Sequence, residues 1–470
     1  MTGKKRLFLA AVGPPGGYSL VTPPLGLLYI AAHLREHFAL DIRIINQRAA
    51  GWTSQRLIKE IVAFEPHVVG LGCMTPSAHV LPEITQGIRD SLPEALMVLG
   101  GPHISALQTA AVAATAADIG VVGEGEMVME QVMRAYIEGG AMDSIPGLIR
   151  REPDGAVVRN PGSVPLIENL DALPMPAYDL IDVPTYWRQP GMPTIPRRNY
   201  VSLFSSRGCP YNCMYCHNVF GRGFRGHSVE RILEEIKCAK SRYGADEIEF
   251  VDDCFNLDRK RLMDYSQRLC SEIGPIKTAF PNAIRADILD DETADALTNA
   301  GMYYTALALE SGTKRIQKLI GKRLDIEKFC NATALCNERR VFTNGFVMLG
   351  FPTETAREME ETIRVAADSK LHVASFFRVT PFPNTALFAY VKENAPEKLN
   401  DVHYNDMEYW RVKVNLADVE DAVLDRYLGR AYREFYFRPG RIVRILRDYP
   451  RPFLLPAYVG MFMKRVLRYA

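Results

Sequence analysis

Short apolar runs alternate with longer amphipathic stretches through residues 1–140. The runs are rich in branched aliphatic side chains and occupy 7–12, 41–45, 67–71, 95–99 and 118–122. Such runs predict buried β-strands, and the stretches between them have the length and apolar period of helices. Because alternating strands and helices build a parallel sheet with covered faces, residues 1–140 are predicted to form a doubly wound, Rossmann-like α/β domain.

The same alternation returns in residues 199–380, with apolar runs at 200–205, 247–251, 278–281, 305–309, 341–349 and 373–379. Between the two regions, residues 141–198 predict a hairpin around Pro153-Asp154-Gly155 and then an irregular, proline-rich connector from Pro161 to Pro196. Residues 381–470 are predicted to be helical, at 419–437, 439–448 and 455–469. The chain therefore divides into four predicted parts.

One loop, directly after the run at 200–205, holds Cys209, Cys213 and Cys216 in a C-x3-C-x2-C spacing. Three thiolates in one short loop suit a soft metal. A closed zinc site needs a fourth ligand, for which His217 is the candidate, whereas a 4Fe-4S cluster can keep one iron open. The odd number of cysteines favours the iron–sulfur cluster.

The other cysteines show no paired spacing. They are Cys73, Cys238, Cys254, Cys270, Cys330 and Cys336. They predict neither a disulfide framework nor a second cluster, and they favour a reducing cytoplasm. Cys330 and Cys336 lie in a helical stretch and are expected to be core thiols.

The cysteine loop resembles that of the radical S-adenosylmethionine (radical SAM) superfamily, in which an aromatic residue, here Tyr215, precedes the last cysteine. The resemblance implies a partial (β/α)6 barrel and a SAM molecule that chelates the open iron. Active-site residues of such barrels lie at the carboxyl ends of strands. The residues expected to contact SAM are Tyr215, Asp252, Asp253, Arg285, Glu310, Ser311 and Gly350. Each polar residue alone could also be a helix cap or a surface residue, but their joint placement favours function.

Three glycine-rich loops follow predicted strands of the first domain, and their order resembles the cobalamin-binding domain that precedes the radical SAM domain in one large class. They read GLGCMTPS at 70–77, LGGPH at 99–103 and VGEGE at 122–126. The residues expected to contact cobalamin are Gly72, Thr75, Ser77, Gly100, Gly101, Gly123, Glu124 and Gly125. From the pattern alone, ordinary tight turns between strand and helix are an equally good interpretation.

The cobalt ligand of free-standing cobalamin domains is missing from this sequence. Those domains use the histidine of an Asp-x-His-x-x-Gly motif, but the corresponding segment here is Asn46-Gln47-Arg48-Ala49-Ala50-Gly51. Arginine has no lone pair to offer a metal. We therefore expect no protein nitrogen on cobalt, and we expect His67, His79 and His103 to be loop or surface residues.

Composition and charge set limits on the partners. The 56 Lys and Arg residues nearly balance the 55 Asp and Glu residues, and without a long single-sign run this does not favour nucleic acid. The run at 7–12 is too short for a secretory signal, and no run approaches the roughly 20 residues of a membrane span. A cytoplasmic protein is expected. The basic, amphipathic stretch 455–469 is expected to pack against the barrel or to rest on a membrane surface.

The resemblance implies a cobalamin-dependent radical SAM enzyme that methylates an unactivated carbon. In this class a 5′-deoxyadenosyl radical removes hydrogen and methylcobalamin donates the methyl group. The expected partners are a small-molecule substrate, with a large or lipid-like molecule among the candidates, and an external electron donor such as flavodoxin or ferredoxin. The alternatives are a radical cyclase or ring-rearranging enzyme, like the anaerobic magnesium-porphyrin ester cyclases, and a non-catalytic cobalamin-binding sensor. Intact Cys209, Cys213, Cys216 and Glu310 count against the sensor.

Overall fold

The computed structural model describes residues 4–15, 20–189, 191–193, 195, 197–217, 219–404 and 414–455. The chain forms two compact units, the first made chiefly of Met1–Pro190 and the second chiefly of the residues that follow. Most of the predicted connector thus belongs to the first unit. The finer division of the chain at 140, 198 and 380 stays a prediction.

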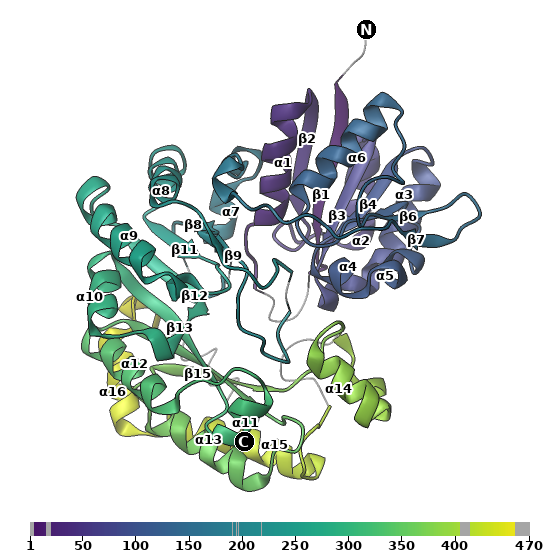
Figure 1. Cartoon of the computed structure of the whole chain (residues 1–470). Coiled ribbons are helices and arrows are strands. Elements are labelled where there is room, and N and C mark those ends of the chain that lie inside the picture. The colour runs from purple at the N-terminus through teal and green to yellow at the C-terminus, as the bar shows by residue number, and fades with distance from the viewer. Residues whose placement is uncertain are drawn as a thin grey trace. The chain divides into compact units, whose positions relative to one another are not determined.

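The first unit is built on a sheet with helices on both faces (Figure 1). Within the described residues its strand order is β2-β1-β3-β4-β5-β6-β7. The first five strands are parallel, and β6 and β7 add an antiparallel edge. The strands are β1 (Lys5–Val12), β2 (Leu40–Asn46), β3 (Val68–Cys73), β4 (Leu96–Gly100), β5 (Ile119–Gly120), β6 (Ile149–Arg151) and β7 (Val157–Arg159). All predicted strands of this region and the hairpin are confirmed.

The order of these strands reverses at β1, since β2 lies on one side of it and β3 on the other. In doubly wound sheets a ligand binds at the carboxyl ends of the strands beside such a reversal. The helices that cover the sheet are α1 (Leu25–His37), α2 (Ser54–Phe64), α3 (Leu81–Ser91), α4 (Pro102–Leu107), α5 (Thr109–Ala113) and α6 (Glu126–Glu138), with the 3-10 helix η1 (Thr75–Val80) before α3. The expected ligand site of this unit is therefore the edge formed by the ends of β1, β3 and β4.

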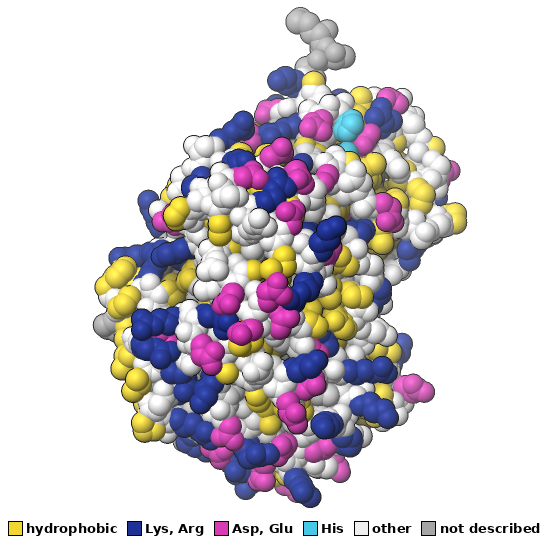
Figure 2. All heavy atoms as spheres, turned by 60° about the vertical axis from the view of Figure 1, so that its left-hand side comes forward, with side chains coloured by type: hydrophobic (Ala, Val, Ile, Leu, Met, Phe, Trp, Pro, Cys, Tyr) yellow, Lys and Arg dark blue, Asp and Glu magenta, His cyan; other side chains and the backbone are white. Residues whose placement is uncertain are grey.

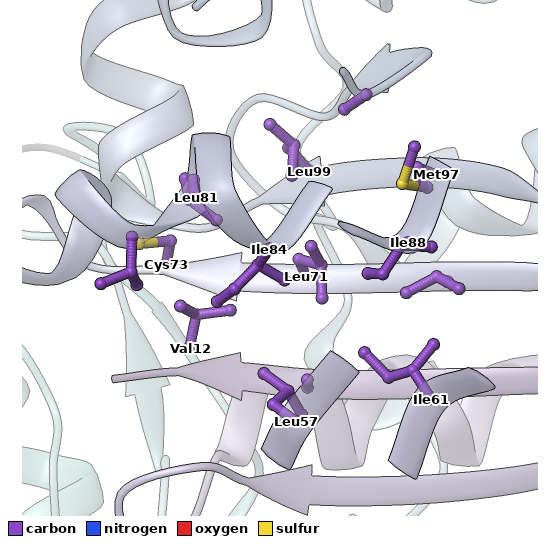
Figure 3. Close-up of a cluster of buried hydrophobic side chains, with 14 of the residues drawn as sticks. Val12, Leu57, Ile61, Leu71, Cys73, Leu81, Ile84, Ile88, Met97 and Leu99 are labelled. Atoms are coloured by element: carbon purple, nitrogen blue, oxygen red, sulfur yellow. The ribbon is translucent and has the colours of Figure 1, made fainter. Parts of the chain in front are cut away.

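Apolar side chains of α2 and α3 fill the space over one face of this sheet. Leu57 and Ile61 of α2 and Ile84 and Ile88 of α3 are fully buried, and Figure 3 shows them with Leu71 of β3. Burial of such side chains contributes roughly 1.5–3 kcal/mol each. This core holds the sheet whose loops are expected to carry cobalamin.

The proline-rich connector is less irregular than predicted. It contains the 3-10 helices η2 (Leu170–Ala172) and η3 (Tyr178–Leu180) and the short helix α7 (Val183–Trp187). Pro184 stands in the first turn of α7, where its fixed φ suits a helix and its missing N–H is not needed. The prediction that proline excludes regular elements throughout was therefore wrong here. Pro190 and Pro196 lie outside the described residues.

The second unit is built on six parallel strands in the order β15-β14-β13-β12-β11-β8, which is the order of the sequence. The edge strands β8 and β15 do not pair with each other in the part of the chain that the structure describes. The strands are β8 (Tyr200–Leu203), β11 (Glu247–Phe250), β12 (Lys277–Ile284), β13 (Met302–Glu310), β14 (Phe342–Leu349) and β15 (Val373–Arg378). The predicted partial (β/α)6 barrel is confirmed, although β12 and β13 run longer than predicted.

Most helices of the second unit lie along the outer side of its curved sheet, and α14 (Ala386–Asn394) stands apart from them (Figure 1). The others are α8 (Val229–Tyr243), α9 (Arg259–Glu272), α10 (Asp291–Asn299), α11 (Lys314–Leu319), α12 (Ile326–Glu338), α13 (Ala356–Asp368), α15 (Asp421–Tyr436) and α16 (Pro439–Asp448). Shorter elements are β9 (Ser206–Arg207), β10 (Arg225–Gly226), η4 (Phe255–Leu257), η5 (Ala286–Ile288), η6 (Pro396–Asp401) and η8 (Pro452–Leu454). The helix predicted at 455–469 lies, after its first residue, outside the described residues.

Two features of the structure concern possible partners: the distribution of surface charge and the length and apolar content of the helices. Figure 2 shows basic and acidic side chains mingled over the face that it presents. Among the described helices, none has both the length and the apolar content needed to cross a bilayer.

A buried ionic network lies where β8 and β11 begin. The guanidinium of Arg198 donates to Glu247 and to Glu249, with Nη2 of Arg198 2.6 Å from Oε2 of Glu249. Tyr303 donates its hydroxyl to Glu247 at 2.7 Å. Arg198, Glu247 and Glu249 are each at most 2% exposed, and burial raises the pKa of Glu249. One cation therefore balances two buried carboxylates.

Replacing this cation should destabilise the second unit strongly. Arg198→Met leaves two buried carboxylates without a counter-charge, and we expect a loss of about 3–5 kcal/mol in the free energy of unfolding from denaturant titration. The matched control is Arg430→Met, which removes exposed ion pairs with Glu360 and Glu434 and should cost less than about 1 kcal/mol. Equal, small losses in the two variants would contradict the assignment.

Candidate active site

The cysteine loop lies at the carboxyl end of β8 and is held from three sides. Gly208, whose φ is +84°, donates its N–H to Oδ2 of Asp253 at 3.1 Å. The N–H of Met214 donates to the carbonyl of Ile320 at 2.9 Å, and the carbonyl of Met214 accepts from Leu387 at 2.7 Å. The loop is thus fastened to the ends of β11 and α11 and to the start of α14.

Gly321 makes one of these attachments possible. Its φ is +70°, and a Cβ atom at this position would lie 2.6 Å from the carbonyl oxygen of Asn212 in the cysteine loop. A side chain at 321 would therefore push the loop away.

Asp252 ties the end of β11 to the end of β8. Its carboxylate accepts from the N–H of Ser205 at 2.7 Å, from the hydroxyl of Ser206 at 2.6 Å and from the hydroxyl of Ser205. Arg261 of α9 lies 4.0 Å from Oδ2. Burial raises the pKa of Asp252, and Arg261 and the serine donors oppose that rise. Both oxygens accept hydrogen bonds, so Asp252 holds the turn that leads into the cysteine loop, and its contact with SAM stays a prediction.

Glu310 ends β13 in a left-handed conformation, with φ of +62°. Its Oε1 accepts from the hydroxyl of Tyr215 at 3.1 Å and from Nζ of Lys322 at 3.2 Å. Lys322 also donates to the carbonyl of Ala308 at 2.6 Å. Oε2 of Glu310 accepts from none of the described residues, although the residue is only 7% exposed. The structure thus brings together Tyr215 and Glu310, and one glutamate oxygen is left to accept from a ligand.

The other predicted SAM residues differ in whether their polar atoms already have partners within the protein. Asp253 uses only Oδ2 within the described structure and is exposed. Ser311 is fully buried, with its hydroxyl 3.2 Å from that of Thr362 on α13. Arg285 pairs with Asp287 at 2.7 Å and lies 3.6 Å from the ring centre of Tyr211 in the cysteine loop. Gly350 has a φ of +99°, which favours glycine. The hydroxyl of Ser311 already has a partner in Thr362. Asp253, by contrast, has one carboxylate oxygen without a partner among the described residues.

Two residues of this site were not predicted. Lys322 stands in the loop after α11, and no motif marked it. Glu354 lies just after β14, and its Oε2 accepts from the N–H groups of Gly350 at 2.7 Å and Phe351 at 3.0 Å. Burial raises the pKa of Glu354 to about 7, and its Oε1 has no hydrogen-bond partner in the described structure. The position of Glu354 four residues after Gly350 was the available signal.

The cysteine loop fits an iron–sulfur cluster better than a single zinc ion. His217, the candidate fourth zinc ligand, packs edge-on against Phe382, with ring centres 5.5 Å apart. Among the described residues, the group of three potential ligands gathered within 4.8 Å is His33, His37 and Glu130, where Arg134 also binds the carboxylate. The cysteine sulfurs form no such tight group, as expected for ligands at separate corners of a cluster. Desolvation raises the pKa of Cys209 and Cys213, so iron must displace their protons.

The glycines of the predicted cobalamin loops are of two kinds: those at which a Cβ atom would clash with the protein and those at which it would not. Gly101 has a φ of +91°, and a Cβ atom there would lie 2.9 Å from the carbonyl oxygen of Cys73. At Gly125 it would lie 2.8 Å from Ile30. At Gly100, by contrast, a Cβ atom would meet nothing within 4 Å among the described residues, and at Gly72 only ordinary contacts. Packing requires Gly101 and Gly125, whereas Gly100 faces open space and Gly72 would tolerate a Cβ atom in ordinary contact with Leu27.

The remaining residues predicted to contact cobalamin are mostly engaged within the protein. Glu124 is 3% exposed and accepts from the N–H of Ile167 at 2.8 Å, which ties the connector to the first unit. Gly123, with φ of +73°, donates its N–H to Ser105 at 3.0 Å. Thr75 and Ser77 are buried in η1. Ser77 accepts from Arg48.

Arg48 occupies the reversal point of the sheet. Its Nη2 donates to the hydroxyl of Ser77 at 3.2 Å, and the guanidinium lies against Gly13 at the end of β1. Desolvation lowers the pKa of Arg48. Of the histidines, His67 accepts through Nδ1 from the N–H of Arg6 at the opposite ends of the strands, and His103 is half-buried on α4. A cation thus lies where the sequence of free-standing cobalamin domains places a histidine.

Comparisons with known proteins agree with this geometry. Residues 203–366 match the family model of the radical SAM superfamily, and residues 18–133 match that of the B12 binding domain. The chain is 30% identical to an uncharacterized methyltransferase of Pyrococcus horikoshii over 95% of this chain and 93% of the relative. It is 24% identical to the anaerobic magnesium-protoporphyrin IX monomethyl ester cyclase of Rubrivivax gelatinosus, over 88% and 74%.

A solved structure shares the fold of both units. OxsB, a cobalamin-dependent S-adenosylmethionine radical enzyme solved with aqua-cobalamin bound, matches with a TM-score of 0.76 and 15% identity. The match covers 99% of this chain and 72% of that chain.

The first prediction from this site concerns the metal. Replacing Cys209, Cys213 and Cys216 together by Ala should abolish the iron–sulfur absorbance and the formation of 5′-deoxyadenosine, because no thiolates remain to hold the cluster. Cobalamin should still bind, since the glycine-rich loops are untouched. Cys330→Ala, on the outside of α12, is the control and should keep the cluster. A triple variant that retains its iron would show that the site lies elsewhere.

The second prediction concerns cobalt. Arg48 has no lone pair for cobalt, so the cobalamin should be bound with neither its own base nor a histidine on the metal. Electron paramagnetic resonance of the Co(II) form measures this directly, because an axial nitrogen splits each cobalt line into a triplet. Unsplit lines are expected. Triplets that disappear in His103→Ala or His79→Ala would identify that histidine as the ligand and refute the prediction.

Proposed function

Because this chain belongs to the cobalamin-binding radical SAM family, as its cysteine and glycine-rich loops predicted, we propose that it methylates an unactivated carbon of a small-molecule substrate. The observation that carries the proposal is the match to a methyltransferase over almost the whole of both chains. The two sets of site residues are also both present, one at the strand ends of each unit. The sensor alternative leaves the intact cysteine loop and Glu310 without a purpose.

Within the second unit, three cysteines would hold the cluster and two carboxylates would bind SAM. Cys209, Cys213 and Cys216 come from a loop whose position is fixed by Asp252 and Gly321. Oε2 of Glu310 and the free oxygen of Asp253 suit the hydroxyl and ammonium donors of SAM. Lys322 holds the carboxylate of Glu310 in place through their ion pair. The bound cluster, SAM and cobalamin supply the 5′-deoxyadenosyl radical and the methyl group.

Within the first unit, the open backbone at Gly100 and the neighbouring strand end at Gly72 would receive the corrin and its nucleotide tail. Arg48, held by Ser77, would keep a protein nitrogen lone pair away from cobalt. Cobalamin bound here would supply methyl-carrier chemistry, and this segment of the chain would give its cobalt no histidine ligand. The absence of the histidine ligand therefore makes chemical sense for a methyl carrier.

Reaction at an open iron also needs electrons, and we propose that a small electron carrier such as flavodoxin or ferredoxin supplies them. We further propose that the substrate is large for a small molecule, or lipid-like. The edge strands β8 and β15 do not pair with each other in the described residues, and an unclosed barrel suits a bulky substrate. Nucleic acid is not proposed as a partner, since net charge is +1.

The reaction products test the proposal. The enzyme is incubated with cobalamin, a strong reductant, SAM carrying a deuterated methyl group, and a small-molecule extract. We expect both 5′-deoxyadenosine and S-adenosylhomocysteine, with deuterated methyl appearing in a carbon-bound position of one extract component. The cysteine triple variant is the control and should make no 5′-deoxyadenosine.

Two other outcomes would refute methyl transfer. Formation of 5′-deoxyadenosine without S-adenosylhomocysteine would assign the chain to cyclisation or ring rearrangement, as in the relative from Rubrivivax gelatinosus. Formation of neither product, with cobalamin bound, would favour the sensor.

A further inference from the structure

Helix α16 packs its charged face inward. Arg441 is 1% exposed, and its guanidinium donates to the carbonyl oxygens of Leu371 at 3.1 Å, Ala367 at 3.0 Å and Ser369 at 2.9 Å. Its guanidinium carbon also lies 3.4 Å from the ring centre of Phe435. The buried arginine thus satisfies carbonyl oxygens at the end of α13 and before β15 and fixes the helix to the barrel.

The last turn of α16 is anchored in the same way. The carboxylate of Asp448, whose side chain is fully buried, lies 3.0 Å from Nε2 of His372. Arg447 of the same helix pairs with this carboxylate. Burial lowers the pKa of His372 to about 4, so the ring is neutral at physiological pH. Hydrogen bonds and ion pairs therefore hold α16 at both ends, in place of an apolar stripe.

The opposite face of α16 is apolar and exposed. Ile442, Val443 and Leu446 are 46%, 61% and 53% exposed, and they recur at the spacing of one helix face. Phe437, just before the helix, and Phe453, in η8 just after it, are 65% and 71% exposed. An ordinary surface helix buries such a stripe. Five large apolar side chains gathered on one helix and its two ends indicate a docking surface. We call these five residues the α16 face.

The charge around the α16 face is strongly positive. Residues 437–455, at the α16 face, contain five Arg residues and one acidic residue, Asp448, so their net charge is +4. In the sequence, residues 456–470 add three basic residues and no acid, which makes +7 for 437–470 in a chain whose total is +1. Asp448 is buried. Arg438 and Arg447 are partly exposed beside the apolar residues, and the acidic groups that face them are Asp368, 2.6 Å from Arg438, and Asp448. The segment joins apolar and cationic side chains without an exposed acid of its own.

We propose that the α16 face docks on an anionic lipid surface. Apolar side chains enter the boundary between head groups and acyl chains, while flanking arginines attract anionic head groups. Two other occupants fit the charge less well. The chain's own residues 456–470 carry three further basic residues and no acid, and a second copy would bring another +7 segment. Repulsion between like charges opposes both of these contacts, whereas an anionic bilayer attracts the positive charge beside the α16 face.

The docking is independent of the proposed methyl transfer, because it needs neither cluster nor cobalamin. If both are correct, the enzyme works at a surface where lipid-like substrates are found. Docking can therefore be measured without substrate, and its failure would leave the assay of the reaction products unaffected.

Vesicle flotation of the full chain tests the proposal. One set of vesicles is phosphatidylcholine alone, and the other is equal parts phosphatidylcholine and phosphatidylglycerol. We expect the protein to float with the second set only and to be released by salt. Val443→Ser combined with Leu446→Ser should weaken binding at least about tenfold, because two apolar side chains leave the bilayer boundary.

The matched control is Ile137→Ser combined with Ile288→Ser, two exposed residues on α6 and η5 that are not part of the α16 face, which should bind like the parent protein. Absence of binding to both kinds of vesicle, or equal loss in the two double variants, would overturn the proposal. Sedimentation velocity without vesicles identifies the other occupants. Self-association abolished by the Val443 and Leu446 changes would assign the α16 face to a second copy. A face that responds in neither experiment would be covered by residues 456–470.

Discussion

The carboxylate of Asp252 is the contact on which the geometry of the second unit's site depends. Parallel strands β8 and β11 bring their carboxyl ends to one edge, but the chain must turn sharply after Leu203 to form the cysteine loop. Ser205 and Ser206 make that turn with their N–H and hydroxyl groups directed at a single buried carboxylate. A buried charge that is fully hydrogen-bonded fixes its partners closely, because an unpaired one costs several kcal/mol. The position of this turn therefore determines where the three cysteines lie.

Strain at Glu310 is the second consequence of building a site at strand ends. A left-handed, non-glycine residue costs about 1–3 kcal/mol and persists only where its surroundings hold it. Here a bulge in β13 precedes Glu310, and Tyr215 and Lys322 hold its carboxylate from the cysteine loop and from the loop after α11. The conformation couples Glu310, the residue proposed to bind SAM, to the cysteine loop. A change that loosens either loop is therefore expected to disturb both Glu310 and the cysteines.

Apolar periodicity was enough to predict the strands and both sheets, because buried parallel strands read as continuous branched-aliphatic runs. The cysteine spacing was enough to predict the metal, and Glu310 followed from a short motif. Sequence could not divide the remaining polar residues between ligand and scaffold. Asp252 and Asp253 are neighbours of one type, yet one is occupied by two serines and the other keeps an oxygen free. Gly100 and Gly101 differ in the same way, since only the second is pressed against Cys73. These distinctions depend on partners tens of residues away.

Helix α16 shows a second limit of prediction from sequence. An amphipathic period predicts that a helix has an apolar and a polar face, but it does not determine which face is buried. The usual assumption is that the apolar face is buried, and its basis is the area of apolar surface removed from water. At α16 this assumption fails, because the free carbonyl groups at the end of α13 and before β15 need donors, and the guanidinium of Arg441 supplies several at one position. Leaving one buried carbonyl unsatisfied costs about 1–3 kcal/mol, which is comparable to exposing one aliphatic side chain, and Arg441 satisfies several carbonyls at once. The apolar residues that are consequently turned outward still favour removal from water, and a second surface is needed to provide it.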